Sequence, residues 1–122
     1  MADLRGRSGA EPLQVRSETK DGAVIVRPSG DIDMAGSPTL RMELRKVQVS
    51  KPMRLVIDLA GVPYMDSSGV ATLVEAMQIA RKNNTKLILC ALQDKVRSIF
   101  EIARLDTVFT IVSSTDAAYA MQ

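Results

Sequence analysis

The stretch from Leu55 to Asn83 constrains the fold most, because its apolar spacing changes in the middle. It begins with LVIDL, a short apolar run rich in β-branched residues and bounded by Gly61 and Pro63, which predicts a buried strand. Apolar residues then recur at helical spacing, which predicts a helix with one apolar stripe: Val70, Leu73, Val74 and Met77. The opposite side of this helix is expected to carry Thr72, Glu75 and Lys82.

The tetrad Asp66-Ser67-Ser68-Gly69 lies at the junction between that strand and that helix. The first turn of a helix has backbone N–H groups without intrahelical partners and a partial positive charge. A carboxylate or hydroxyl there can cap the helix, and a phosphate is also stabilised there. One cap group is enough, so the second serine hydroxyl is left to face solvent. The residues alone leave two interpretations open, a cap only or a cap with a modifiable hydroxyl.

Two strands and a helix are predicted before the central stretch. Pro12 to Thr19 alternates apolar and polar residues, Lys20-Asp21-Gly22 suits a hairpin turn, and Ala23 to Arg27 returns as a second strand. Pro28 lacks an N–H donor and is expected at the end of that strand or at an unpaired edge. A helix follows, with Ser37 as its cap and Pro38 at its first position, and it ends at Lys51-Pro52.

Strands and helices also alternate after the central stretch. Asn83-Asn84 ends the central helix, and four elements are then expected: a strand over Lys86 to Leu92, a helix over Val96 to Ala103 capped by Asp94, a strand over Thr107 to Val112, and a short helix over Ala117 to Met121 capped within Ser113 to Asp116. This alternation favours an α/β fold with a mainly parallel sheet, to which the opening hairpin adds antiparallel pairing.

The segment VIDLAGVPYMDSSG, followed by an amphipathic helix, resembles the signature of the STAS domain, specifically that of the bacterial anti-sigma factor antagonists. Three further pieces agree in order and spacing: Gly30-Asp31-Ile32-Asp33, the strand Lys86 to Ala91, and the helix Val96 to Ala103. The resemblance covers roughly residues 13 to 121. Members often have Gly where Ala71 stands, a difference that leaves Ser67 intact.

The resemblance implies a STAS-like α/β fold over residues 12 to 122, a mainly parallel mixed sheet with an N-terminal β-hairpin and about four helices. Residues 1 to 11, MADLRGRSGAE, are polar and lack periodicity, so they are expected to form a disordered leader. In this family the serine directly after the Asp is phosphorylated by the anti-sigma factor, which implies Ser67 here. The Asp that matches Asp33 lies close to that serine and shapes the partner surface.

The expected partner-binding residues are therefore Asp33, Asp66, Ser67, Ser68, Gly69 and Ile79. Ile79 is included for a reason independent of the family. At 100° per residue it lies on the opposite side of the central helix from the apolar stripe. An isoleucine there belongs either to the partner surface or to packing under a neighbouring element.

Composition excludes several classes of protein. The chain has 122 residues, 46% hydrophobic and 25% charged, which is ordinary for one globular domain. Its net charge is +2 and its aromatic content 3%, so no surface for nucleic acid is predicted. The single Cys90 lies in an apolar run and is expected to be buried, which suits a reducing cytoplasm. No run predicts membrane insertion or a signal peptide.

The chain also lacks the residues of common active sites. It has no histidine, no Cys-x-x-Cys, no Gly-x-Ser-x-Gly and no phosphate loop with lysine. Asp31 and Asp33 are paired acids, but no third ligand is close in sequence. We therefore expect no catalytic residues, no metal site and no cofactor, and a binding surface with a modifiable hydroxyl remains.

The leading hypothesis is an anti-sigma factor antagonist in a partner-switching module. Without phosphate it binds an anti-sigma factor that is also a serine kinase, phosphorylation of Ser67 releases it, and a serine phosphatase resets it. One alternative is a STAS scaffold or regulatory subunit of a stress-signalling or lipid-transport assembly. Another is a module that binds a small ligand such as a nucleotide or lipid.

Overall fold

The computed structural model describes residues 11–121, so the predicted leader lies outside the described residues except for Glu11. The described chain forms β1 (Gln14–Lys20), β2 (Ala23–Ser29), α1 (Ser37–Gln48), β3 (Arg54–Asp58), α2 (Ser67–Lys82), β4 (Lys86–Cys90), α3 (Asp94–Ile102), a 3-10 helix (Leu105–Thr107), β5 (Thr110–Val112) and α4 (Thr115–Ala120). None of the helices within 11–121 combines the length and the apolar character needed to cross a membrane.

The five strands form one sheet in the order β1-β2-β3-β4-β5. The β1 and β2 strands are antiparallel, and every later neighbour pairs in parallel, so the predicted mixed, mainly parallel sheet is confirmed. Asp21 and Gly22 both have positive φ, 51° and 80°, as the predicted hairpin turn requires. Pro28 lies near the end of β2, beyond the part of that strand that pairs with β3, as predicted.

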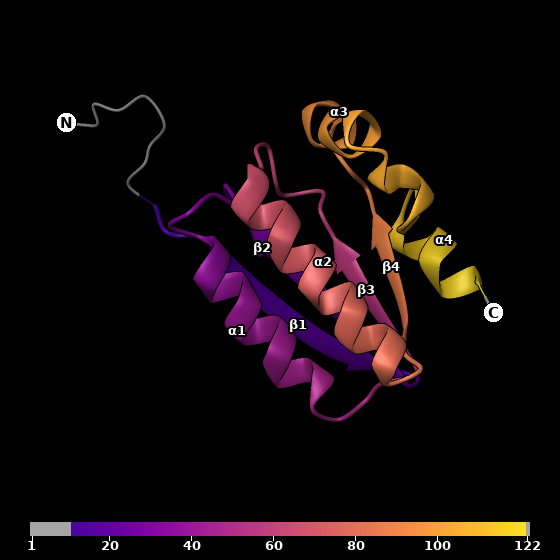
Figure 1. Cartoon of the computed structure of the whole chain (residues 1–122). Helices are drawn as coiled ribbons and strands as arrows, with labels where there is room; N and C mark the ends of the chain where they lie inside the picture. Colours follow the sequence, from indigo (N-terminus) through magenta and orange to yellow (C-terminus); the bar gives the residue numbers. More distant parts are fainter. Residues whose placement is uncertain (1–10, 122) are drawn as a thin grey trace.

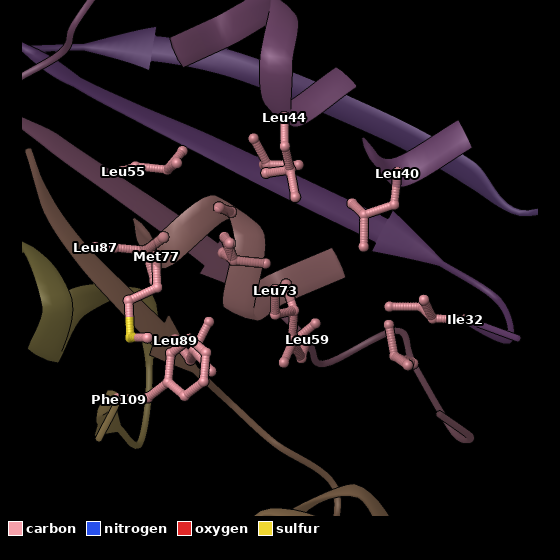
Figure 2. Packing of buried hydrophobic residues seen from close by; sticks show 14 of the residues in the cluster. Ile32, Leu40, Leu44, Leu55, Leu59, Leu73, Met77, Leu87, Leu89 and Phe109 are labelled. Carbon is pink, nitrogen blue, oxygen red and sulfur yellow. The ribbon is translucent and has the colours of Figure 1, made fainter. Parts of the chain in front are cut away.

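Each face of the sheet has its own helical cover. In Figure 1, α1 and α2 run side by side over one face, and α4 lies toward the other end of the sheet. The larger core lies between the sheet and the pair α1 and α2, as Figure 2 shows, and includes Ile32, Leu40, Leu44, Leu55, Leu59, Leu73, Met77, Leu87, Leu89 and Phe109. A smaller cluster on the opposite face joins β2, β3 and β4 to α4: Ile25, Val56, Ile88, Cys90 and Ala118.

The side of α2 opposite its apolar stripe packs against α1. Thr72, predicted on that opposite side, is only 1% exposed, so this polar side is covered. Glu75 forms ion pairs with Arg41 and Arg45 of α1, at 3.3 and 2.6 Å. The spacing in the sequence identifies the stripe that faces the sheet, but it does not show that a second, polar stripe is covered by another helix.

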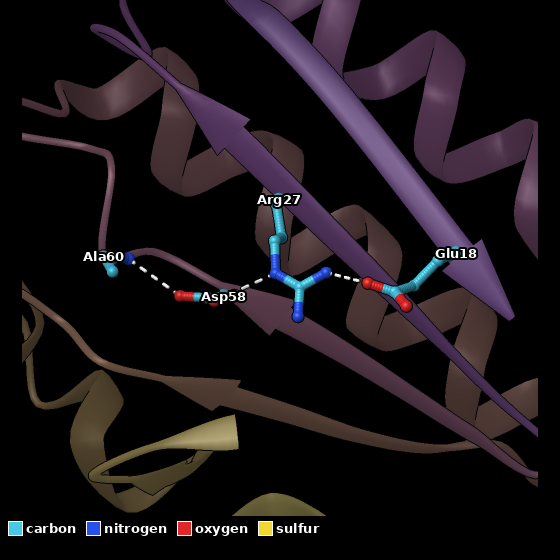
Figure 3. Close-up of polar contacts among 4 residues, drawn as sticks. All are labelled: Glu18, Arg27, Asp58 and Ala60. Carbon is cyan, nitrogen blue, oxygen red and sulfur yellow. Dashed lines mark hydrogen bonds and ion pairs between the residues drawn. The ribbon is translucent and has the colours of Figure 1, made fainter. Parts of the chain in front are cut away.

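A polar network crosses three strands on the face that carries α4 (Figure 3). The Arg27 guanidinium of β2 donates to Glu18 of β1 and, at 3.3 Å, to Asp58 of β3. Asp58 also accepts a hydrogen bond from the Ala60 backbone N–H at 3.0 Å. The hydrogen bond to Glu18 is the main reason that the pKa of Arg27 is raised. This face is therefore part polar network and part apolar cluster.

Several predicted boundaries differ from the structure near the C-terminus. The last strand is shorter than expected, because a 3-10 helix occupies Leu105–Thr107 and Phe109 turns inward to pack edge-to-face on Phe100, with ring centroids 5.5 Å apart. Asp94 is the first residue of α3 rather than its cap, since Gln93 precedes the helix and makes no side-chain cap bond. Ser114 caps α4 by accepting a hydrogen bond from the Ala117 N–H, within the segment predicted.

The predicted burial of Cys90 is confirmed, since its side chain is 0% exposed. Burial, helped by the charge of Asp58, raises the pKa of the thiol to about 12. At pH 8 the thiol is thus almost entirely protonated and shielded, and only the thiolate is a strong nucleophile.

We therefore expect native Cys90 to resist a thiol reagent at pH 8 and to react fully once guanidinium unfolds the chain. Absorbance of the released thiol product measures both rates. A matched control is the double variant Cys90→Ser with Ser98→Cys, which places the one thiol on the exposed side of α3 and should react within the mixing time. Fast labelling of the native wild-type chain would contradict the prediction.

Candidate functional site

The candidate site is built from two loops that run side by side. One leads from β2 to α1 and carries Asp33, and the other leads from β3 to α2 and carries Asp66. Ile32 is the point of attachment, because its N–H donates to the Tyr64 carbonyl at 3.0 Å and its carbonyl accepts from the Asp66 N–H at 3.2 Å. An isolated parallel bridge also pairs Ile32 with Met65, beyond the ends of β2 and β3.

Gly69 allows α2 to begin directly against this attachment. A Cβ at position 69 would lie 2.7 Å from the Ile32 carbonyl oxygen and 2.6 Å from Met65 Cγ. Real Cβ atoms do not approach other atoms so closely, and the Ile32 carbonyl is backbone that other hydrogen bonds hold in place. Gly69 therefore contributes to the site by leaving room for close packing.

Asp66 is the N-cap of α2. Its Oδ1 accepts hydrogen bonds from the Ser68 N–H at 2.9 Å, the Gly69 N–H at 3.4 Å and the Ser68 hydroxyl at 2.6 Å. The hydrogen bond from the Ser68 hydroxyl is the main reason that the pKa of Asp66 is lowered. Of the tetrad's possible caps, the structure selects Asp66 rather than a serine, because its carboxylate reaches the N–H groups of both Ser68 and Gly69.

Ser67, to which the family resemblance pointed, is the exposed serine of the pair. Within residues 11–121 no group hydrogen-bonds to its hydroxyl, whereas the Ser68 hydroxyl is half-buried and bonded. Ser67 is also the first residue of α2, where the helix dipole is most positive. The arrangement presents one solvent-facing hydroxyl at a position that stabilises negative charge.

Asp33 holds the loop between β2 and α1 in place. Its Oδ1 accepts hydrogen bonds from the N–H groups of Ala35 at 3.1 Å and Gly36 at 2.9 Å. Gly36 is the N-cap residue of α1, and Ser37 is the first helical residue, so the expected cap role of Ser37 is corrected. The Ser37 hydroxyl oxygen instead lies 2.7 Å from the Asp33 carbonyl oxygen, within hydrogen-bond distance.

An open hollow of about 580 Å³ lies between the two loops. Its lining combines three carboxylates with small and large apolar groups: Asp31, Asp33, Met34, Ala35, Tyr64 and Asp66. Met34 is 79% exposed and Tyr64 47%, which is high for large hydrophobic side chains. Sequence reasoning missed both, because each falls in a loop where no periodicity marks it, although an exposed methionine beside a motif is a usable signal.

The comparisons with known proteins agree with this architecture. The family model described as STAS domain matches residues 14–118. The chain belongs to the STAS domain family. This STAS domain is 35% identical over 83 residues to the anti-sigma-B factor antagonist of Listeria monocytogenes, a match that covers 68% of this chain and 73% of the relative.

Solved structures show the same fold. An anti-sigma factor antagonist from Mycobacterium paratuberculosis superposes with a TM-score of 0.82 at 28% identity, covering 88% of this chain and 91% of the other. The Bacillus cell fate determinant SpoIIAA in its phosphorylated form superposes with a TM-score of 0.69 at 17% identity, covering 89% and 100%. The predicted STAS-like α/β fold is confirmed.

Ile79 is not brought to the two loops. It lies twelve residues after Ser67 on α2, which is about 18 Å along the helix axis. It is half-buried and lines a separate hollow at the far end of α1 with Arg45, Gln48, Val49, Lys51 and Asn83. The structure thus places Ile79 apart from the other five predicted partner-binding residues. Within residues 11–121, no group of three or more Cys, Asp or Glu side chains is arranged to hold a metal ion.

The Asp66 cap leads to a prediction about stability. Asp66→Ala removes the acceptor of three hydrogen bonds and should lower the free energy of unfolding by about 1–2 kcal/mol. Asp66→Asn keeps a neutral acceptor and should lose less. Because the pKa of Asp66 is lowered on folding, its contribution is complete above the ordinary carboxyl pKa of about 4 and is lost as pH falls through the lower folded value.

Urea unfolding at pH 7 and pH 2.5 measures this. The difference between wild type and Asp66→Ala should be largest at pH 7 and should shrink at the lower pH. Asp116→Ala, which removes an exposed acid from the first turn of α4, is the matched control. Equal losses at both pH values would show that the carboxylate charge has no part in the cap.

Proposed function

We propose that this STAS domain is an anti-sigma factor antagonist that works by partner switching in the cytoplasm. Without phosphate it binds an anti-sigma factor with serine kinase activity, and phosphorylation of Ser67 releases that partner. A serine phosphatase restores the binding form. The observation that carries the proposal is the Ser67 hydroxyl, which is exposed at the start of α2 and stands directly beside the acidic Asp66.

The proposed docking surface is the pair of loops around Ser67. Asp33, Asp66, Ser67, Ser68 and Gly69 belong to it, and Met34 and Tyr64 add exposed apolar area. Exposed apolar side chains with a polar rim are typical of surfaces that bind proteins. The carboxylates of the hollow favour a partner with cationic side chains, because complementary charge raises the association rate and fixes the register.

Phosphorylation changes this surface without requiring a change of fold. The Ser67 Oγ forms a bond to the γ-phosphorus of ATP, the bond to the ADP oxygen breaks, and the hydroxyl proton passes to a base of the kinase. The new group carries about −1.5 to −2 charges. The N-terminus of α2 stabilises it locally, while the neighbouring carboxylates add negative charge that the partner would have to desolvate.

The known proteins support this reading over other uses of the fold. The Listeria relative is an anti-sigma-B factor antagonist, and the Mycobacterium protein of the same fold is an anti-sigma factor antagonist. SpoIIAA has the same fold and has been solved in a phosphorylated form, so the fold is compatible with that modification.

The proposal predicts different outcomes for wild type and two variants when each is mixed with a cognate anti-sigma factor that has serine kinase activity. Wild type should gain one phosphate, on Ser67. Ser67→Ala should bind and never be released, because it has no acceptor and adds no charge. Ser67→Asp should fold but bind at least about 100-fold more weakly, which is about 2.7 kcal/mol of repulsion and desolvation. Ser98→Ala and Ser98→Asp, on exposed α3, are the matched controls.

Phosphopeptide mapping and calorimetric titration give the two readouts. Phosphate on Ser68 instead of Ser67 would overturn the assignment of the acceptor. Equal affinities for the Ala and Asp variants at position 67 would overturn the release mechanism. If the anti-sigma factor kinase binds none of these forms, the proposed function itself is wrong.

A further inference from the structure

Four oxygen atoms form a continuous chain that joins the two loops of the site. The Asp33 carbonyl oxygen lies 2.7 Å from the Ser37 hydroxyl, which lies 2.8 Å from the Ser68 hydroxyl, which lies 2.6 Å from Asp66 Oδ1. Ser37 is 4% exposed, one of the few buried polar side chains among the described residues, and Ser68 is half-buried. No sequence signal marked Ser37 beyond its expected use as a helix cap.

This row of four oxygen atoms has more contacts than protons to fill them. Both ends, a carbonyl and a carboxylate, only accept hydrogen bonds, and each of the two hydroxyls between them has one proton to donate. Three contacts of hydrogen-bond length therefore share two protons. At any moment one contact is left without a proton, and rotation of the two hydroxyls decides which one it is.

The neighbouring acceptors decide the favoured arrangement. The Asp33 carbonyl already accepts from the N–H groups of Gly36 at 3.1 Å and Ser37 at 2.8 Å, so it remains satisfied without the hydroxyl. Asp66 is a carboxylate, and hydrogen bonds to charged acceptors are stronger than those to neutral ones. The protons thus favour the order Ser37 to Ser68 to Asp66. In this order each bond polarises the next and strengthens it.

A charge on Ser67 disturbs this order at its receiving end. A phosphate or carboxylate on Ser67 lies next to Asp66 in the chain, repels its carboxylate and competes for the free N–H groups at the start of α2. If Asp66 turns away, the Ser68 proton is free to point to Ser37, and the Ser37 proton then points to the Asp33 carbonyl. Two hydroxyl rotations are sufficient for this reversal.

We propose that Ser37 is a positioning residue that couples the Asp33 loop to the cap of α2. A negative charge on Ser67 then changes the hydrogen bonds of both loops that border the hollow. The inference deepens the proposed function, on which it rests for its biological use. It extends the surface altered by phosphorylation from the serine itself to Ala35 and Gly36, whose N–H groups Asp33 holds. One added charge thereby alters both loops that a partner would contact.

The experiment uses the chain alone and the variant Ser67→Asp as the probe of added charge. Amide resonances of Ala35 and Gly36 are compared in four proteins: wild type, Ser67→Asp, Ser37→Ala and the double variant. We expect Ser67→Asp to shift both resonances clearly, and the same change to shift them less than half as far in the Ser37→Ala background. Ser37→Thr keeps a hydroxyl and should restore the response.

The chemical shift of the Asp66 carboxyl carbon, followed as a function of pH, measures the pKa of Asp66. A merely structural role of Ser37 would leave this pKa unchanged. In the proposed proton order, Ser37→Ala weakens the bond from Ser68 and raises the pKa of Asp66 toward its ordinary value. In the opposite order, the freed Ser68 proton would turn to Asp66 and lower that pKa. Asp31 and Asp33 line the same hollow, so their carboxyl carbons are followed in the same titration.

Matched variants keep the proposal falsifiable. Ser50→Ala removes an exposed hydroxyl that follows α1 and donates to the Val47 carbonyl at its far end, and it should change neither readout. If Ser37→Ala fails to fold, Ser68→Ala removes the other hydroxyl between the two loops. It should also reduce the amide shifts of Ala35 and Gly36 that Ser67→Asp causes. Equal shifts with and without the Ser37 hydroxyl, or an Asp66 pKa that stays or falls in Ser37→Ala, would overturn the proposal. Neither readout needs a kinase, so a failure here is distinct from a failure of Ser67 phosphorylation.

Discussion

The attachment of the two loops through Ile32 is the interaction on which the rest of the site depends. Its N–H and carbonyl hold the stretch from Tyr64 to Asp66, and this fixes where α2 starts. Gly69 makes the short distance possible, since any larger residue would overlap the Ile32 carbonyl. The backbone of Ser67 therefore has a defined position, because the Ile32 hydrogen bonds hold the chain directly before the helix.

The packing of α1 on α2 is more polar than the packing of either helix on the sheet. Thr72, the ion pairs of Glu75, and a hydrogen bond from Gln48 to the Ala76 carbonyl at 3.0 Å lie along this contact. Polar contacts are directional, so they fix the rotation and register of one helix against the other more tightly than apolar contacts alone. The Ser37 and Ser68 hydroxyls lie at the end of this contact that adjoins the site.

The sequence predicted the order of the strands and helices, although not all of their boundaries. Apolar spacing predicted β3, α2 and β4, and the family resemblance pointed to Ser67, which the structure exposes. Periodicity could not reveal contacts between helices, so the burial of Thr72 was missed. Residue type could not assign the caps either, because Asp, Ser and Gly all suit a helix start. Only three-dimensional geometry shows which oxygen reaches the free N–H groups.

The same limit explains why Ser37 escaped notice. A serine before a proline at a helix start fits a cap, and nothing in the linear order indicates that it lies beside a serine 31 positions later. The two meet because the sheet brings the ends of β2 and β3 together and both following helices start from that edge. Parallel strands thus gather two helix N-termini, two carboxylates and three serines at one edge of the sheet. The switch proposed above needs only a change of charge and two hydroxyl rotations, because its oxygen atoms already lie within hydrogen-bond distance of one another.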